Sequence, residues 1–238
     1  RVISVGYLAL VREGKLSGAN GADWRDCYLF LPWEDWRAGK PAVIDKHIAP
    51  ALARWTVAAP TQSIRRERRE RSDIHFGLNG APWVPERVLE RYELLYEIEL
   101  AVEALRDRAP AGGAFEGLPP WAPQMGLPMT LDHRRILATA LGRLRGKLKY
   151  RPVVFELLPS TFTLLQLQRV VEALAGVHLH KQNLRRLVET GGLVEGTGRM
   201  QQRTGGRPAE LFRFRREVLR ERPAPGVGIP GSRHSSLA

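Results

Sequence analysis

Residues 180–198, HKQNLRRLVETGGLVEGTG, hold the side chains best suited to reading another molecule. An arginine can donate two parallel hydrogen bonds to guanine O6 and N7, and an Asn or Gln can form a similar pair of bonds with adenine N6 and N7. Four residues of these types stand close together: Gln182, Asn183, Arg185 and Arg186. They are the candidate base-reading residues, and Lys181 beside them is suited to a phosphate.

The pattern of this segment predicts a short helix with two unlike faces. Side chains advance by about 100° per residue around a helix, which places the apolar residues on one stripe: Leu184, Leu187 and Val188. The candidate readers lie outside this stripe, and Gly191 and Gly192 end the helix. For Glu189 we favour an ion pair with Arg185, four residues before it. Because polar faces often only face water, the use of this one depends on its surroundings.

The net charge of +12 is concentrated in the second half of the chain. Residues 1–130 hold 17 basic and 17 acidic side chains, whereas residues 131–222 hold 19 basic and 8 acidic ones. This asymmetry predicts two modules with different partners, and the basic one is suited to the phosphates of double-stranded DNA. An acidic lipid surface is the rival partner. It would need exposed large apolar residues, and those of the basic module are better used as core, so we expect no membrane contact.

The elements expected in the basic module, residues 131–222, give the polar face a use. In order they are a helix in LDHRRILATALGRLRGKLKY (131–150), a strand in PVVFELLP (152–159), a helix from Thr163, a turn at 176–179, the helix described above, and the strands LVEG and AELFRF with a polar loop between them. Thr163 and Gln166 have the spacing of a capping box. This is the order of a winged helix-turn-helix domain, whose second helix enters the major groove while the hairpin loop reaches the backbone or the minor groove. The hairpin adds three candidate DNA contacts: Arg203, Arg207 and Arg213.

The front module, residues 1–108, gives weaker signals. RVISVGYLALV (1–11) and DCYLFLPWEDW (26–36) predict buried strands, and residues 85–107 predict one long helix whose broad apolar face is the expected dimer surface. For Trp24, Trp33 and Trp36 we favour core or dimer packing over an aromatic nucleotide pocket. The run RRERRERSD (65–73) is interpreted as a solvated charged segment, with phosphate binding as the alternative.

Two segments outside these modules have the composition of irregular chain. Glycine and proline punctuate residues 109–130, which predicts a linker, and residues 223–238 predict a disordered tail.

Cys27, the one cysteine, is interpreted as a small buried hydrophobe. A single cysteine permits no internal disulfide, which fits the cytoplasm. His178 and His180 are interpreted as turn or cap residues, because no cluster has metal-ligand spacing. No run of 18 apolar residues predicts a membrane span.

The motifs also carry a resemblance to a known family. HKQNLRRLVETGGLVEGTG followed by GGRPAELFRF is similar to the C-terminal winged helix of the Nudix-related transcriptional regulators of NAD metabolism (the NadQ/NrtR type). RVISVGYLAL, LPWEDWR and ERYELLYEIELAVEALRD resemble the effector domain of the NadQ branch, and the resemblance extends to about Pro225. It implies an α+β chain, in which a partial Nudix-like α/β effector domain precedes a C-terminal winged helix-turn-helix domain.

The same resemblance implies a function. The chain would be a homodimeric repressor of NAD biosynthesis or salvage genes that binds a double-stranded DNA operator. A nucleotide effector such as ADP-ribose, NAD or ATP would control it, through residues that the sequence does not identify.

One departure from the family pattern bears on catalysis. The Nudix signature, a glycine followed by a loop and a helix with an REUxEE cluster, is absent. Because those carboxylates hold Mg²⁺, we expect no catalytic residues and no enzymatic activity. In the related proteins the opening strand follows this signature, so we also expect the N-terminal part of the Nudix-like domain to be missing. Two alternatives stay open: a hydrolase of nucleoside diphosphate derivatives with a DNA-binding domain attached, and a basic interaction module that reads no specific operator.

Overall fold

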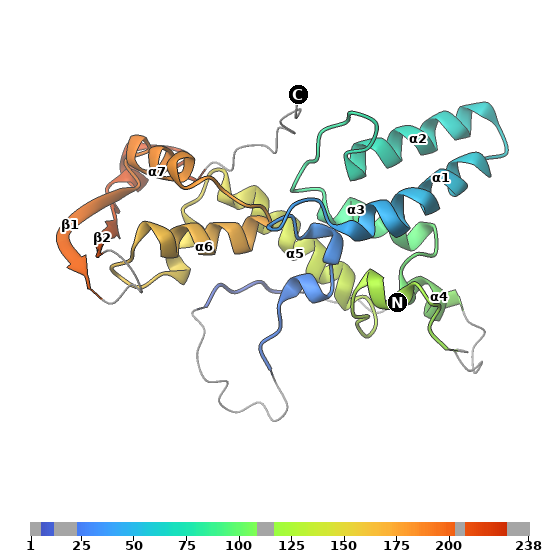
Figure 1. The fold of residues 1–238 in the computed structure, drawn as a ribbon, viewed down its shortest axis with the longest axis horizontal. Coiled ribbons are helices and arrows are strands. Elements are labelled where there is room, and N and C mark those ends of the chain that lie inside the picture. The colour runs from blue at the N-terminus through green and yellow to red at the C-terminus, as the bar shows by residue number, and fades with distance from the viewer. Residues whose placement is uncertain (1–5, 12–22, 109–116, 203–207, 228–238) are drawn as a thin grey trace. The chain divides into compact units, whose positions relative to one another are not determined.

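The computed structural model describes residues 6–11, 23–108, 117–202 and 208–227. They divide into two units, whose elements are labelled in Figure 1. The helical unit holds residues 24–108 and 117–142, and the winged-helix unit holds residues 6–11, 23, 143–202 and 208–227. The division falls inside helix α5 (His133–Leu148).

The regular structure of the helical unit, over its described residues, is helical. It opens with the 3-10 turns η1 (Cys27–Leu29) and η2 (Pro32–Glu34) and a π-helical turn, η3 (Ile44–Ile48). Helices α1 (Ala49–Val57) and α2 (Gln62–Phe76) then form an antiparallel pair (Figure 1). Helices α3 (Val88–Glu97) and α4 (Val102–Arg108), the 3-10 turn η4 (Ala122–Met125) and the first part of α5 complete the unit.

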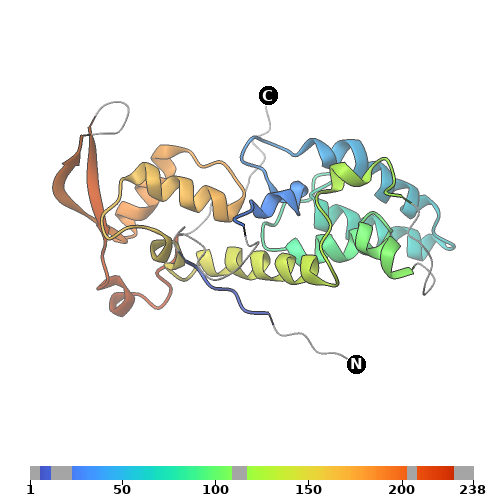
Figure 2. The ribbon, with the colours of Figure 1, turned by 90° about the horizontal axis from the view of Figure 1, so that it is seen from below.

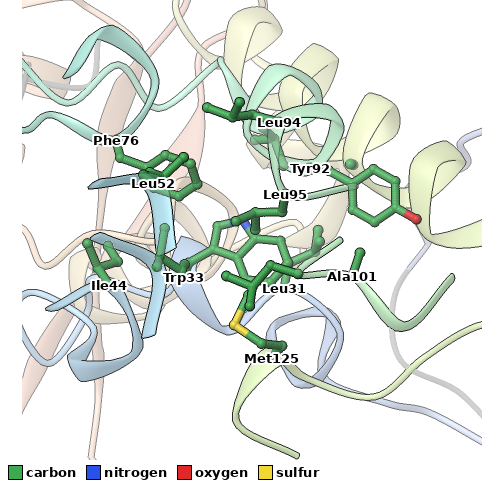
Figure 3. Close-up of a cluster of buried hydrophobic side chains, with 14 of the residues drawn as sticks. Leu31, Trp33, Ile44, Leu52, Phe76, Tyr92, Leu94, Leu95, Ala101 and Met125 are labelled. Carbon is green, nitrogen blue, oxygen red and sulfur yellow. The ribbon is translucent and has the colours of Figure 1, made fainter. Parts of the chain in front are cut away.

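The core of the helical unit surrounds Trp33, which is fully buried among side chains from several elements (Figure 3). Trp36 packs against this core, with its ring centroid 4.5 Å from that of Trp83. Core packing is thus confirmed for Trp33 and Trp36, and Trp33 is not available to a nucleotide. Trp24 differs, since it is 47% exposed.

Two buried ion pairs cross this core. Glu34 accepts hydrogen bonds of 2.5 and 2.9 Å from Arg91, and neither side chain is exposed. Arg91 also donates to three backbone carbonyl groups, those of His75, Val84 and Pro85. Removing one partner from such a pair strands a buried charge and costs about 3–5 kcal/mol. The LPWEDW and ERYELLYE motifs are therefore joined at Glu34 and Arg91.

The second buried pair joins Glu103 of α4 to Arg134 of α5 at 3.2 Å. The guanidinium also donates to the carbonyl groups of Phe30 and Met125. Burial lowers the pKa of Arg134, and the Glu103 carboxylate opposes this shift.

The two strands predicted in the front module are not present. In DCYLFLPWEDW, the Asp26 carboxylate accepts a hydrogen bond from the backbone N–H of Tyr28, and Pro32 begins a second turn, so the backbone forms η1 and η2 instead. Residues 6–11 have no strand partner among the described residues, and Tyr7 is 94% exposed. The α/β expectation for this module is therefore wrong for the described residues; residues 1–5 lie outside them.

The single helix predicted over residues 85–107 is two helices. Glu99 has a left-handed backbone, with φ at 59°, and the N–H of Leu100 donates back to the carbonyl of Leu95. The apolar face predicted for dimerisation is also used within the unit, because Val88, Tyr92 and Leu95 are buried in its core. That face is not the exposed surface that the prediction requires.

The predicted linker is packed over residues 117–130. Met125 is buried, and the N–H of Leu127 donates to the carbonyl of Leu29 at 2.8 Å. Gly126 has φ at 79°, and a Cβ there would stand 2.8 Å from that same carbonyl oxygen. A side chain at position 126 would therefore clash, and the hydrogen bond from Leu127 holds the segment on the helical unit. Residues 109–116 lie outside the described chain.

The winged-helix unit follows the predicted order closely. After α5 come the 3-10 turn η5 (Val153–Leu157), the helices α6 (Leu164–Ala175) and α7 (Lys181–Thr190), and the strands β1 (Val194–Gln201) and β2 (Ala209–Phe214). A short helix, α8 (Val218–Glu221), ends the series. The two strands pair antiparallel as a hairpin (Figure 2). The mixed α+β class with a C-terminal winged helix is confirmed.

Two local predictions in this unit are wrong. PVVFELLP lies between Pro152 and Pro159 and forms the turn η5, and the third strand position is taken by Phe162, which exchanges two backbone hydrogen bonds with Phe212. The predicted tail is ordered at its start, since Val227 is fully buried in the core of the unit. Residues 228–238 lie outside the described chain.

Candidate nucleic-acid interface

Helix α6 is fixed at both ends by local sequence. Thr163 accepts a hydrogen bond from the N–H of Gln166, whose side-chain oxygen accepts one from the N–H of Thr163, and the predicted capping box is thereby confirmed. Gly176 ends the helix with φ at 71°, a conformation that glycine adopts without steric cost.

A polar network holds the turn that follows. The buried Gln168 side chain donates to the carbonyl of Leu179 at 2.8 Å and to the carboxylate of Glu172 at 2.9 Å. The same carboxylate oxygen accepts the N–H of Leu179 and lies 3.1 Å from Nδ1 of His178. Both polar groups of the Leu179 backbone are thus held by side chains of α6, which fixes where α7 begins.

The two histidines of the turn have the positions expected of turn and cap residues. His178 lies in the turn beside Glu172, and His180 is the N-cap residue of α7, although its side chain forms no capping hydrogen bond. Among the described residues, no group of three His, Cys, Asp or Glu could hold a metal ion.

Helix α7 has the two faces that the sequence predicts. Leu184 and Val188 are buried in the core of the unit. The other face is exposed and polar, and it carries Lys181, Gln182, Asn183, Arg185, Arg186 and Glu189. Arg185 donates to Glu189 at 2.9 Å, so the predicted pair is confirmed. The side chain of Arg186 has no ion pair with any described residue, and it remains available to an anion or a base.

The hairpin places its arginines differently from the helix. Arg213 on β2 lies opposite Glu195 on β1 and donates to it at 2.6 Å, with its side chain 62% exposed. Phe212 is buried on the opposite face of the strand, as the alternation predicts. Arg203 and Arg207 lie outside the described residues. Arg199, exposed on β1, is a candidate contact that the prediction omits, although a basic residue in the hairpin is a signal for it.

Comparison with known proteins supports this geometry. A family model described as the NrtR DNA-binding winged helix domain matches residues 154–214. This part of the chain is similar to the NrtR winged-helix domains. The match covers α6, α7 and both strands, and therefore all the candidate contacts named above.

Individual relatives match a larger part of the chain than the family model does. The ADPR responsive transcriptional repressor NtrR of Acinetobacter baylyi is 38% identical over 88 residues, which are 37% of this chain and 35% of that protein. Two solved structures of Shewanella oneidensis NrtR, one of them complexed with a 27mer DNA, are 34% and 35% identical. They cover 39% of this chain and 42% and 41% of theirs, with TM-scores of 0.34 and 0.32. The chain thus spans about a third of the length of the curated relative that it matches.

None of the helices in the described chain has the length and the apolar composition needed to cross a bilayer.

Proposed function

We propose that the protein is a DNA-binding transcriptional repressor of NAD biosynthesis or salvage genes. The observation that carries the proposal is the exposed polar face of α7 in a domain that is similar to the NrtR winged-helix domains. In a helix-turn-helix protein the second helix of the pair lies in the major groove, where arginine and amide side chains can read base edges. The relative that is named an ADPR responsive transcriptional repressor supports the link to NAD metabolism.

The proposal assigns roles to individual side chains. Gln182, Asn183, Arg185 and Arg186 read base edges, and Lys181 contacts a phosphate from the first turn of the helix, where the free N–H groups favour anions. Arg203, Arg207 and Arg213 of the hairpin contact the backbone or the minor groove. Arg185 must exchange Glu189 for a base on binding, whereas Arg186 has no described partner to lose.

Selection of binding sites from a random-sequence duplex library tests the proposal. We expect one preferred operator, on which Arg185→Ala and Arg186→Ala each weaken binding by about 1–3 kcal/mol and relax the preference at one base position. Arg143→Ala removes an exposed cation from α5 and is the matched control. If the two variants bound every DNA sequence more weakly by the same factor, these arginines would be phosphate contacts and not base-reading residues. Failure to select any operator would favour the basic interaction module.

We further propose that the front module senses a nucleotide effector, such as ADP-ribose, NAD or ATP, without hydrolysing it. The absent REUxEE signature supports this, as does the naming of the curated relative as a repressor. Incubation of the purified protein with ADP-ribose and Mg²⁺ should release no AMP above the level of a sample with a chelator. Release of AMP that the chelator abolishes would restore the hydrolase alternative.

Finally, we propose that the protein binds its operator as a homodimer. One winged helix offers few base contacts, and regulators of this plan gain affinity by binding two half-sites through a two-fold axis. Sedimentation of the protein with a palindromic operator should give two chains for each duplex. A ratio of one chain for each duplex at saturation would exclude the dimer.

A further inference from the structure

The N-terminal part of α2 carries a hollow in which every lining residue has a hydrogen-bond donor in its side chain. It has a volume of about 510 Å³ and is lined by Gln62, Ser63, Arg65, Arg66 and Arg69. None of these residues is acidic, and Glu67 and Glu70 of the same helix do not line the hollow. Three guanidinium groups around one space produce a strong positive potential there.

The five arginines of α2 fall into two sets. Arg68 donates to the carbonyl of Trp55 at 2.7 Å and lies over the indole ring, and Arg71 forms an ion pair with Glu97 at 2.6 Å. These two anchor α2 to its neighbours. Arg66 and Arg69 are exposed and pair with no acidic residue of the described chain. Anchoring the helix therefore does not account for these two side chains.

Arg65 joins the two sets. Its Nη2 donates to the carbonyl of Val57 at 3.1 Å, which fixes the guanidinium beside the hollow. Its Nε is buried and has no hydrogen-bond acceptor among the described residues. A buried donor without an acceptor is costly, so the contacts of the fold alone do not account for the position of this guanidinium. In the first turn of this 15-residue helix, the Thr61 side chain accepts the N–H of Ile64, and the N–H groups of the two residues before Ile64 have no acceptor within the helix.

A second hollow shares one lining residue with the first. It has a volume of about 550 Å³, lies between α1 and α2, and shares Arg69 with the donor-lined hollow. Its walls include the apolar side chains of Leu52 and Val57, the hydroxyl groups of Thr56 and Ser72, and the carboxylate of Asp73. Arg69 thus borders both a donor-lined hollow and a partly apolar one.

We propose that the donor-lined hollow of α2 binds a phosphate-bearing ligand. Guanidinium groups bind phosphate oxygens through paired, charge-assisted hydrogen bonds, and three of them match a group with two or more negative charges. The phosphate belongs either to a free nucleotide or to the backbone of DNA. The inference does not depend on the proposed repressor function, because it concerns direct binding by the helical unit.

Titration calorimetry of the full chain at low salt tests the free-ligand source, with pyrophosphate and ADP as probes. We expect Arg66→Gln with Arg69→Gln to weaken binding by about tenfold or more. The control is Lys46→Gln with Arg54→Gln, which removes the same charge from exposed positions of the helical unit outside the hollow. The control should bind both probes like the wild-type chain. Far-ultraviolet circular dichroism confirms that all chains are folded.

A second arm tests DNA as the source, by measuring the affinity for a nonspecific duplex at several salt concentrations. If α2 contacts the DNA backbone, the double variant lowers the slope of log K against log salt by about 2, and the control pair does not. A difference between variant and control in either arm supports phosphate binding in the hollow, and the arm in which it occurs shows whether the phosphate belongs to a free ligand or to DNA. Identical behaviour of the two double variants in both arms, including no binding by either, would overturn the proposal.

Discussion

The core of the helical unit and the exposed face of α7 use arginine in opposite ways. In the helical unit, Arg91 and Arg134 are fully buried, and each is paired with a glutamate and bound to backbone carbonyl groups. On α7 of the winged-helix unit, Arg186 is exposed and has no ion pair with the described chain. Burial demands a partner, because an isolated buried charge is very costly, whereas an exposed arginine costs the fold nothing. An arginine's surroundings thus separate structural roles from binding roles.

The largest effect is expected at the buried pair of the helical unit. Glu34→Ala should lower the free energy of unfolding by about 3–5 kcal/mol, because Arg91 is left charged in the core. Urea unfolding followed by tryptophan fluorescence measures this loss, with the exposed Glu90→Ala on α3 as the control. The double change Glu34→Met with Arg91→Met should recover only part of the loss, since three carbonyl groups lose their donor. A loss below about 1 kcal/mol for Glu34→Ala would contradict the structural role of the pair.

A smaller effect is expected at the turn before α7. Gln168→Ala leaves the carbonyl of Leu179 without its donor, which should destabilise the winged-helix unit by about 1–3 kcal/mol. Operator binding should weaken as well, because the start of α7 is no longer fixed. Arg169→Ala changes an exposed neighbour on the same helix and should have no effect on unfolding. Equal unfolding curves for the two variants would show that the network is not needed.

The cap of α6 should contribute less. Thr163→Ala removes one half of the capping box and should cost about 1 kcal/mol in the free energy of unfolding. Thr163→Ser keeps the hydroxyl oxygen that accepts the N–H of Gln166, so it should unfold close to the wild-type chain. Equal losses in the free energy of unfolding for the serine and alanine variants would show that the hydroxyl group at position 163 does not stabilise the helix.

The smallest of these effects on unfolding should belong to an arginine that is proposed to read a base. Arg186→Ala should change the free energy of unfolding by no more than about 0.5 kcal/mol, because its side chain is exposed. The measurement is again urea unfolding, made without DNA. If Arg186→Ala lowered the free energy of unfolding as much as Glu34→Ala, exposed arginines could not be distinguished from buried ones by their contribution to stability.

The sequence predicts the winged-helix unit well because its signals are local. The capping box of Thr163, the alternation around Phe212 and the apolar stripe of α7 each act within a few residues, and the structure contains all three. The exception is the third strand. PVVFELLP has the composition of a strand, but its flanking prolines favour a turn, and Phe162 pairs with β2 through contacts that span 50 residues.

The helical unit is predicted less well because long-range contacts decide its structure. No glycine marks the break at Glu99, so the apolar periodicity continues through it. The pairing of Glu103 with Arg134 joins residues 31 apart, and nothing in either segment alone indicates it. Contacts with other helices also decide which arginines of α2 anchor it, since Arg68 binds Trp55 and Arg71 binds Glu97, and the run of arginines alone does not reveal this.

The network around Gln168 has a consequence for how this domain can change over time. Side chains of α6 hold the backbone of Leu179, and α7 itself supplies only its apolar stripe to the core. The exposed positions of α7 therefore contribute little to folding, and substitutions there are not constrained by the need to keep the domain intact. After a gene duplication, the recognised DNA sequence could diverge while the scaffold stays the same. The same property would let a designer graft a different reading face onto this turn.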